Sequence, residues 1–120
     1  MNDNSCENRR SPKTMAAASI GDCIHVAGIF NFFKLAESAG WETQFIGAAK
    51  SPEEIAIWTH ENRPHVLAIG YRLDPNAAGR LIERLVKALE DAGVEPRPRL
   101  IFGGTPPVAK VARESGVFEK

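Results

Sequence analysis

Four strand-like runs alternate with four helix-like runs along these 120 residues, and this alternation is the strongest constraint on the fold. The clearest strand is residues 66–69, Val-Leu-Ala-Ile, a continuous apolar run of the kind that is covered on both faces of a parallel sheet. The clearest helix start is Ser51-Pro52-Glu53-Glu54, which combines an N-cap, a proline in the first turn and a capping-box glutamate. Strands separated by helices predict a parallel sheet with right-handed crossovers.

The other elements follow from the same signals. Strands are predicted at residues 14–20, 41–46 and 100–102, and helices at residues 28–39, from Pro75 to a stop at Gly93, and from Thr105 to Ser115. The alanines of residues 14–20 favour a helix, but this run is short and ends at a glycine. Gly47 is expected to open a turn, and residues 117–120 resemble the start of a fifth strand. The predicted class is α/β, a doubly wound parallel sheet of four to five strands with helices on both faces.

Composition limits the classes of function. With 43% hydrophobic residues, the chain can bury the core of one domain, predicted at residues 14–120, after a polar arm at residues 1–13. The 15 basic residues balance the 15 acidic ones, so we expect no attraction to nucleic acid or to an anionic membrane. Only two cysteines are present, and neither a secretory signal nor a membrane-spanning apolar run can be recognised, so a cytoplasmic location is predicted.

The loop after the first predicted strand, residues 21–28, reads Gly-Asp-Cys-Ile-His-Val-Ala-Gly. Open α/β sheets bind their ligands at this edge. The glycine spacing does not match a dinucleotide fingerprint, and a phosphate-binding loop ending in Lys and Ser or Thr is missing. His25 is therefore interpreted either as a histidine hydrogen-bonded within the loop or as a metal ligand.

Three short motifs together resemble a known family. Residues 25–28 read His-Val-Ala-Gly, residues 46–47 read Ile-Gly, and residues 103–104 are a glycine pair after the fourth strand. This pattern is similar to the cobalamin-binding domains of methionine synthase, methylmalonyl-CoA mutase and the small subunit of glutamate mutase, whose first loop reads Asp-x-His-x-x-Gly. The resemblance covers residues 14–120 and implies a flavodoxin-like, Rossmann-like cobalamin-binding domain.

In that family the histidine replaces the cofactor's own benzimidazole as the lower axial cobalt ligand, and the released nucleotide tail enters a pocket lined by strands 1, 3 and 4. The resemblance therefore implies a cobalamin, either adenosylcobalamin or methylcobalamin, bound base-off with His25 as the metal ligand. The implied cofactor-binding residues are Asp22, Cys23, His25, Val26, Gly28, Gly70, Tyr71, Arg72, Leu73, Gly103, Gly104 and Thr105.

Two positions depart from the family pattern. The family's acid lies two residues before the histidine, where this chain has Cys23, while Asp22 lies one residue earlier. Either side chain could orient the imidazole as an outer partner of the metal ligand. The family's serine after the third strand is replaced by Gly70, which removes a hydroxyl donor that Tyr71 or Arg72 could supply instead.

The resemblance implies a corrinoid carrier that presents its cofactor to a catalytic partner subunit or domain of mutase or methyltransferase type, and that is not catalytic alone. The alternative is an α/β regulatory or interaction module of the receiver or flavodoxin type without a corrinoid. A receiver would need an acidic cluster and a phosphoacceptor aspartate, whereas the strand ends carry Gly21, Gly47, Gly70 and Gly103.

Two other interpretations use Cys23. The Cys23-x-His25 pair could be half of a zinc site, although His60 and His65 are expected at the opposite end of the sheet. Cys23 could also act as a nucleophile activated by His25, but no third orienting group can be recognised.

Overall fold

The structure is a computed structural model that describes residues 13–118. Its elements, in chain order, are β1 (Thr14–Ile20), α2 (Ala27–Ser38), β2 (Glu42–Lys50), α3 (Pro52–Asn62), β3 (Val66–Gly70), α4 (Pro75–Asp91), β4 (Arg99–Gly103) and α5 (Pro106–Ser115). The alternation predicted from the sequence is therefore confirmed. The predicted polar arm, apart from Lys13, lies outside the described residues.

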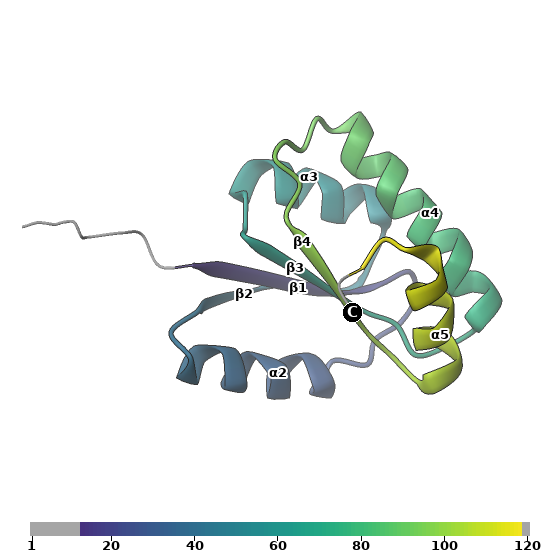
Figure 1. Cartoon of the computed structure of the whole chain (residues 1–120), viewed down its shortest axis with the longest axis horizontal. Coiled ribbons are helices and arrows are strands. Elements are labelled where there is room, and N and C mark those ends of the chain that lie inside the picture. The colour runs from purple at the N-terminus through teal and green to yellow at the C-terminus, as the bar shows by residue number, and fades with distance from the viewer. Residues whose placement is uncertain (1–12, 119–120) are drawn as a thin grey trace, which may run out of the picture.

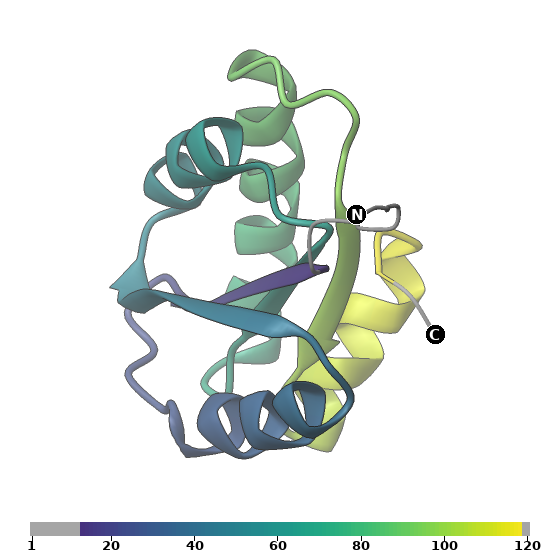
Figure 2. The same cartoon turned by 90° about the vertical axis from the view of Figure 1, so that its left-hand side faces the viewer.

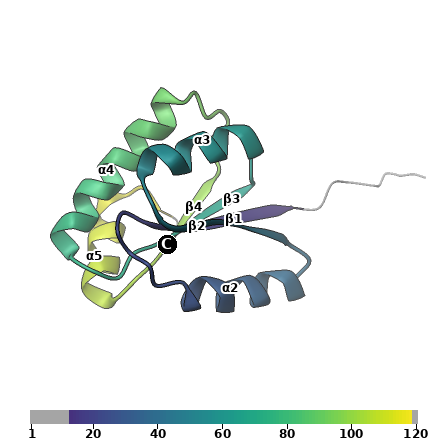
Figure 3. The ribbon, with the colours of Figure 1, turned by 180° about the vertical axis from the view of Figure 1, so that it is seen from behind.

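All described strands are parallel and form one sheet in the order β2-β1-β3-β4. Helix α2 lies alone below the sheet, and α3 and α4 lie side by side above it (Figure 1). Figures 2 and 3 show the same layers from the side and from behind. This strand order is that of the flavodoxin-like folds, so the predicted fold class is confirmed.

Strand β1 is built almost entirely from small side chains. Ala16, Ala17 and Ala18 have no exposed surface, and they alternate between the two core clusters of the sheet. Alanine has the highest intrinsic helix propensity. Here, however, the strand is hydrogen-bonded to two parallel neighbours and covered on both faces, and the free energy gained by this burial exceeds the loss in helix propensity. The strand prediction for residues 14–20 is confirmed for this reason.

The cap predicted at the start of α3 is present. The Ser51 hydroxyl accepts a hydrogen bond from the Glu54 main-chain N–H at 3.1 Å, and the Glu54 carboxylate accepts one from the Ser51 main-chain N–H at 2.9 Å. The second bond is the main reason that the pKa of the Glu54 carboxyl lies below its ordinary value. The capping box fixes the point at which the chain turns from β2 into α3.

The turn predicted at Gly47 is wrong, because β2 continues to Lys50. The pairing with β1 shifts twice along this stretch, from Ala17 opposite Phe45 to Ala18 opposite Gly47, and again before Lys50. Gly47 has a φ of 148°, a backbone conformation that favours glycine, and it lies within this irregular stretch. The extra length of β2 brings its end against the loop that follows β1.

The predicted fifth strand does not begin within the described residues. Val117 and Phe118 follow α5 without strand pairing, and the Phe118 ring lies 5.2 Å from the ring of Phe102 in β4. Glu119 and Lys120 lie outside the described residues. None of the helices within residues 13–118 has both the length and the hydrophobicity needed to cross a membrane.

Candidate functional site

A cavity of about 560 Å³ opens at the carboxyl edge of the sheet, on the face that carries α2. We call it the strand-end cavity. Its floor is formed by the last three residues of β3 and of β4, and α2 contributes one wall. The lining residues are His25, Gly28, Ile29, Phe32, Ala68, Ile69, Gly70, Arg72, Ile101, Phe102, Gly103, Gly104, Thr105 and Pro106.

The cavity exists because side chains are missing from its floor and rim. Gly70 and Gly103 lie opposite each other in adjacent strands. A Cβ atom at Gly28 or Gly103 would have no atom within 4 Å, and one at Gly70 would first meet Ile29 Cδ1 at 3.5 Å. Helix α2 covers β1 and only part of β3, so nothing else fills the space above these glycines. The resulting volume is within the range of small-molecule and cofactor pockets.

The loop that carries His25 is fixed through its main chain. The Ser19 hydroxyl donates a hydrogen bond to the Cys23 carbonyl oxygen at 2.6 Å, and the Ala49 N–H donates to both the Ser19 hydroxyl and the Cys23 carbonyl at 3.0 Å. The Gly21 N–H donates to the Lys50 carbonyl at 2.9 Å. The end of β2 therefore holds the loop in place.

The side chain of His25 lies exposed at the rim of the strand-end cavity. Its Nδ1 atom is 3.5 Å from the sulfur of Cys23, which is fully buried. Asp22 is exposed. Of the two side chains considered as orienting partners, the structure thus brings Cys23 against the imidazole. The Nε2 atom is the ring nitrogen that this contact leaves open to the rim.

The structure brings some of the predicted site residues together and separates others. Those that line the strand-end cavity are His25, Gly28, Gly70, Arg72, Gly103, Gly104 and Thr105, and those that do not are Asp22, Cys23, Val26, Tyr71 and Leu73. The Tyr71 side chain is buried in the core on the other face of the sheet. Its hydroxyl accepts a hydrogen bond from the Asp74 N–H at 3.3 Å, so it serves the loop between β3 and α4. Arg72 is therefore the side chain near Gly70 that can reach a ligand.

Sequence reasoning missed two features of the site. The apolar wall formed by Ile29 and Phe32 is on helix α2, where helical spacing predicts sheet-facing residues but does not distinguish a packed face from an open one. Ser19 is the polar residue in the apolar run of residues 15–20 within β1, and it holds the loop from beneath. A lone serine in such a run is a weak signal, because many hydroxyls in strands have no ligand-related role.

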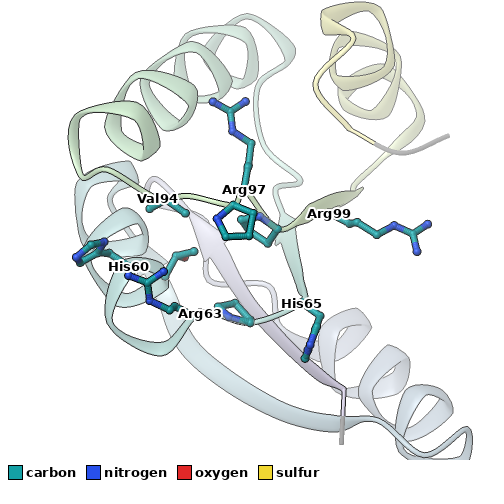
Figure 4. Close-up of a pocket in the computed structure, with 10 residues that line it drawn as sticks. His60, Arg63, His65, Val94, Arg97 and Arg99 are labelled. Atoms are coloured by element: carbon teal, nitrogen blue, oxygen red, sulfur yellow. The ribbon is translucent and has the colours of Figure 1, made fainter. Parts of the chain in front are cut away.

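A second cavity, of about 330 Å³, lies at the opposite edge of the sheet and is lined by basic side chains. Figure 4 shows that the side chains of His60, Arg97 and Arg99 point in different directions and do not converge. The Arg63 guanidinium donates a hydrogen bond to the Glu95 carbonyl oxygen at 3.1 Å, and His65 Nδ1 accepts one from the Thr14 N–H at 3.0 Å. This edge uses its basic groups to join chain segments, and the predicted position of His60 and His65 is confirmed.

Within residues 13–118, no three His, Cys, Asp or Glu side chains gather closely enough to hold a metal ion. Cys23 and His25 therefore form a pair without a third protein ligand in this part of the chain. A metal bound at His25 would have to bring most of its ligands with it, as a metal held in a macrocycle does.

Comparisons with known proteins agree with this geometry. The sequence matches the family model described as "B12 binding domain" over residues 13–118. A crystal structure of a novel cobalamin-binding protein from Desulfitobacterium hafniense DCB-2 has a similar fold, with a TM-score of 0.74 and 23% identity over 88% of this chain. This chain spans 50% of the length of that protein. A search of curated proteins gave no significant match.

A more distant structural likeness is to a mutant of the anti-anti-sigma factor PhyR from Bartonella quintana, with a TM-score of 0.50 and 20% identity. It covers 82% of this chain and 37% of that one. At these identities, both structural likenesses concern the fold alone.

The glycine pair at the end of β4 predicts two different responses to a methyl group. A Cβ at Gly104 would collide with the Tyr71 carbonyl oxygen and come within 3.2 Å of Val108, whereas one at Gly103 would enter open space. We expect Gly104→Ala to lower the free energy of unfolding by about 1–3 kcal/mol and Gly103→Ala to change it by less than about 0.5 kcal/mol. Urea denaturation measures both, and equal losses would contradict the assignment of the close approach to Gly104.

Proposed function

Because this chain belongs to the B12-binding domain family, which matches it over residues 13–118, we propose that its strand-end cavity receives the nucleotide tail of a cobalamin bound base-off, with His25 as the lower ligand of the cobalt. Membership makes the chain a cobalamin-binding domain. The resemblance inferred from the sequence motifs is thereby confirmed.

The observation that carries the proposal is that an exposed imidazole lies at the rim of a cavity whose floor includes two facing glycines, Gly70 and Gly103. The nucleotide tail of a cobalamin is long and narrow and needs a deep cavity. The facing glycines Gly70 and Gly103 provide this depth at the ends of β3 and β4. The apolar wall from Ile29 and Phe32 suits an aromatic base, because burial of apolar surface is favourable by roughly 25 cal/mol per Å².

His25 has the properties of a metal ligand at this rim. A neutral imidazole coordinates a metal through one nitrogen and donates a hydrogen bond from the other. The contact between its Nδ1 and the Cys23 sulfur leaves Nε2 for the metal.

The polar groups of the cavity match the polar part of a nucleotide tail. Arg72 is exposed and lines the cavity, and its guanidinium can neutralise a phosphodiester through paired N–H donors. Thr105 contributes a hydroxyl at the start of α5, whose first two residues, Pro106 and Pro107, have no main-chain N–H to offer a ligand. The main chain of Gly103 and Gly104 can approach a ligand closely.

The proposal includes a catalytic partner. Bound adenosylcobalamin would supply radical chemistry and bound methylcobalamin a transferable methyl group, and the choice between them lies on the upper face of the cofactor. His25 and the strand-end cavity hold and orient the lower face. We therefore propose that another subunit or domain of mutase or methyltransferase type, in trans or in a longer parent chain, binds the substrate, and that both act in the cytoplasm.

Removal of the His25 imidazole tests the proposal directly. We expect wild-type protein mixed with hydroxocobalamin to show the absorption change of a base-off, histidine-bound corrinoid, and His25→Ala to lose it. The affinity should fall by at least the ~10–100-fold typical of losing an outer partner of a metal ligand. His60→Ala, at the opposite edge of the sheet, is the matched control and should behave as wild type.

An absorption spectrum that neither wild type nor His25→Ala alters would contradict corrinoid binding at this rim. It would favour the regulatory or interaction module of the receiver or flavodoxin type. Equal losses in His25→Ala and His60→Ala would contradict the assignment of the ligand.

Gly70 offers a second test, because the family has a serine at this position. A Cβ there would meet Ile29 Cδ1 at 3.5 Å, an ordinary contact, so the fold should accept a serine. We expect Gly70→Ser to tighten cobalamin binding about two- to twelvefold, the equivalent of one net hydrogen bond of roughly 0.5–1.5 kcal/mol. Gly70→Ala, which adds the Cβ without the hydroxyl, is the control, and titration followed by absorbance measures the affinities. Equal affinities in the two variants would show that this position does not face the tail.

A further inference from the structure

The side chain of Ser19 is polar and has no exposed surface, and it lies directly beneath the loop that carries His25. A buried hydroxyl is costly unless its hydrogen bonds are formed. The Ser19 hydroxyl acts both as a donor and as an acceptor. It donates a hydrogen bond to the Cys23 carbonyl oxygen at 2.6 Å and accepts one from the Ala49 N–H at 3.0 Å. Its partners belong to two different segments, so Ser19 joins the loop after β1 to the end of β2.

Ala49 gives this junction a second feature. Its φ is 54°, a left-handed conformation that is uncommon for residues with a Cβ. The same residue donates its N–H to Ser19 and to Cys23. A conformation of this kind persists only where surrounding contacts hold it, and these hydrogen bonds are the contacts that do so. The clamp is thus formed by Ser19, Cys23 and Ala49 together.

Cys23 connects the clamp to the imidazole. Its carbonyl oxygen is held by Ser19 and Ala49, and its sulfur lies 3.5 Å from His25 Nδ1. The side chain has no exposed surface, so the sulfur has little freedom to move away. Fixing the main chain of Cys23 therefore also fixes the atom that faces the ring.

The position of the sulfur matters because a neutral imidazole carries one proton on either nitrogen. A ring that binds a metal through Nε2 must carry its proton on Nδ1, and the group that faces Nδ1 must then accept a hydrogen bond. Sulfur can accept such a bond, although weakly. In this chain the atom in that place is the sulfur of Cys23.

We propose that Ser19 and Cys23 are positioning residues for His25: the Ser19 hydroxyl fixes the main chain of Cys23, and the Cys23 sulfur accepts the hydrogen bond of His25 Nδ1–H. This arrangement leaves Nε2 without a proton at the rim of the strand-end cavity. The role of this tautomer in cofactor binding rests on the proposed function, but the tautomer itself is a property of the protein without ligand.

The test compares four variants by two independent measurements. Long-range proton–nitrogen NMR of histidine-labelled, ligand-free protein reads the His25 tautomer, and absorbance titration with hydroxocobalamin reads the affinity. Cys23→Ala and Ser19→Ala remove the two positioning groups, and Cys23→Asp restores an acceptor. Thr59→Val removes another buried hydroxyl, which donates to the Ile55 carbonyl oxygen within α3 at the opposite edge of the sheet, and is the control for loss of a buried hydrogen bond.

We expect the Nδ1–H tautomer to predominate in wild type and in Thr59→Val, and the Nε2–H tautomer to become a major form in Cys23→Ala. Ser19→Ala should shift the populations in the same direction, and Cys23→Asp should restore the wild-type tautomer. The affinity for hydroxocobalamin should fall by about 10–100-fold in Cys23→Ala and recover in Cys23→Asp. If Cys23→Ala does not fold, Ser19→Ala measured against Thr59→Val provides the same comparison.

A wild-type ring with its proton on Nε2, or a tautomer that is the same in wild type, Cys23→Ala and Ser19→Ala, would overturn the proposal. This result leaves the proposed function intact if wild type binds hydroxocobalamin. Conversely, a tautomer that depends on Cys23 in a protein that binds no corrinoid supports the positioning roles and rejects the proposed function.

Discussion

The pairing of β1 with a parallel neighbour on each side is the interaction on which the rest of the structure depends. It places the loop after β1 at the same edge as the ends of β3 and β4, which lie far away in the sequence. The small side chains of β1 allow layers to cover both faces of the strand closely. Each later feature of the site, from the loop clamp to the glycines, is positioned relative to this strand.

The two faces of the sheet are covered unequally, and the site is a consequence of that difference. Among the helices that the structure describes, three pack on one face, whereas α2 alone covers the other. On the side of α2, the ends of β3 and β4 carry Gly70 and Gly103, so a cavity remains where another sheet would be filled. The opposite edge is also rich in basic groups, and two of them, Arg63 and His65, hold chain segments together. The carboxyl edge combines the larger of these two cavities with the exposed imidazole of His25.

Much of this could be predicted from the sequence, because the elements are defined by strong local signals. The capping box before α3 and the apolar run of β3 each match one element of the structure. The sequence also predicts that the loop at residues 21–28 lies at the ligand-binding edge, because open α/β sheets bind their ligands at the carboxyl ends of the strands. Arg72 and Thr105 lie on the cavity as the family resemblance implies.

Other features depend on packing that a local pattern does not contain. The irregular pairing of β2 extends the strand past Gly47, because the register is set by its neighbour β1. Successive residues of a strand face opposite sides of the sheet. Tyr71, which directly follows β3, continues this alternation, so its side chain enters the core on the face opposite to the cavity. The choice between Asp22 and Cys23 depends on the loop conformation, which is fixed by a hydroxyl from Ser19 beneath it.

The central claim is that a nitrogen of His25 occupies the lower position of the bound cobalt, and electron paramagnetic resonance tests it most directly. The protein, labelled with ¹⁵N in histidine only, is loaded with cob(II)alamin, whose unpaired electron couples to the axial nitrogen. The account predicts that the triplet splitting from ¹⁴N becomes a doublet in the labelled protein, and that the doublet is absent in His25→Ala. A triplet that persists in the labelled protein would show that the cofactor's own base remains bound, which would contradict the account.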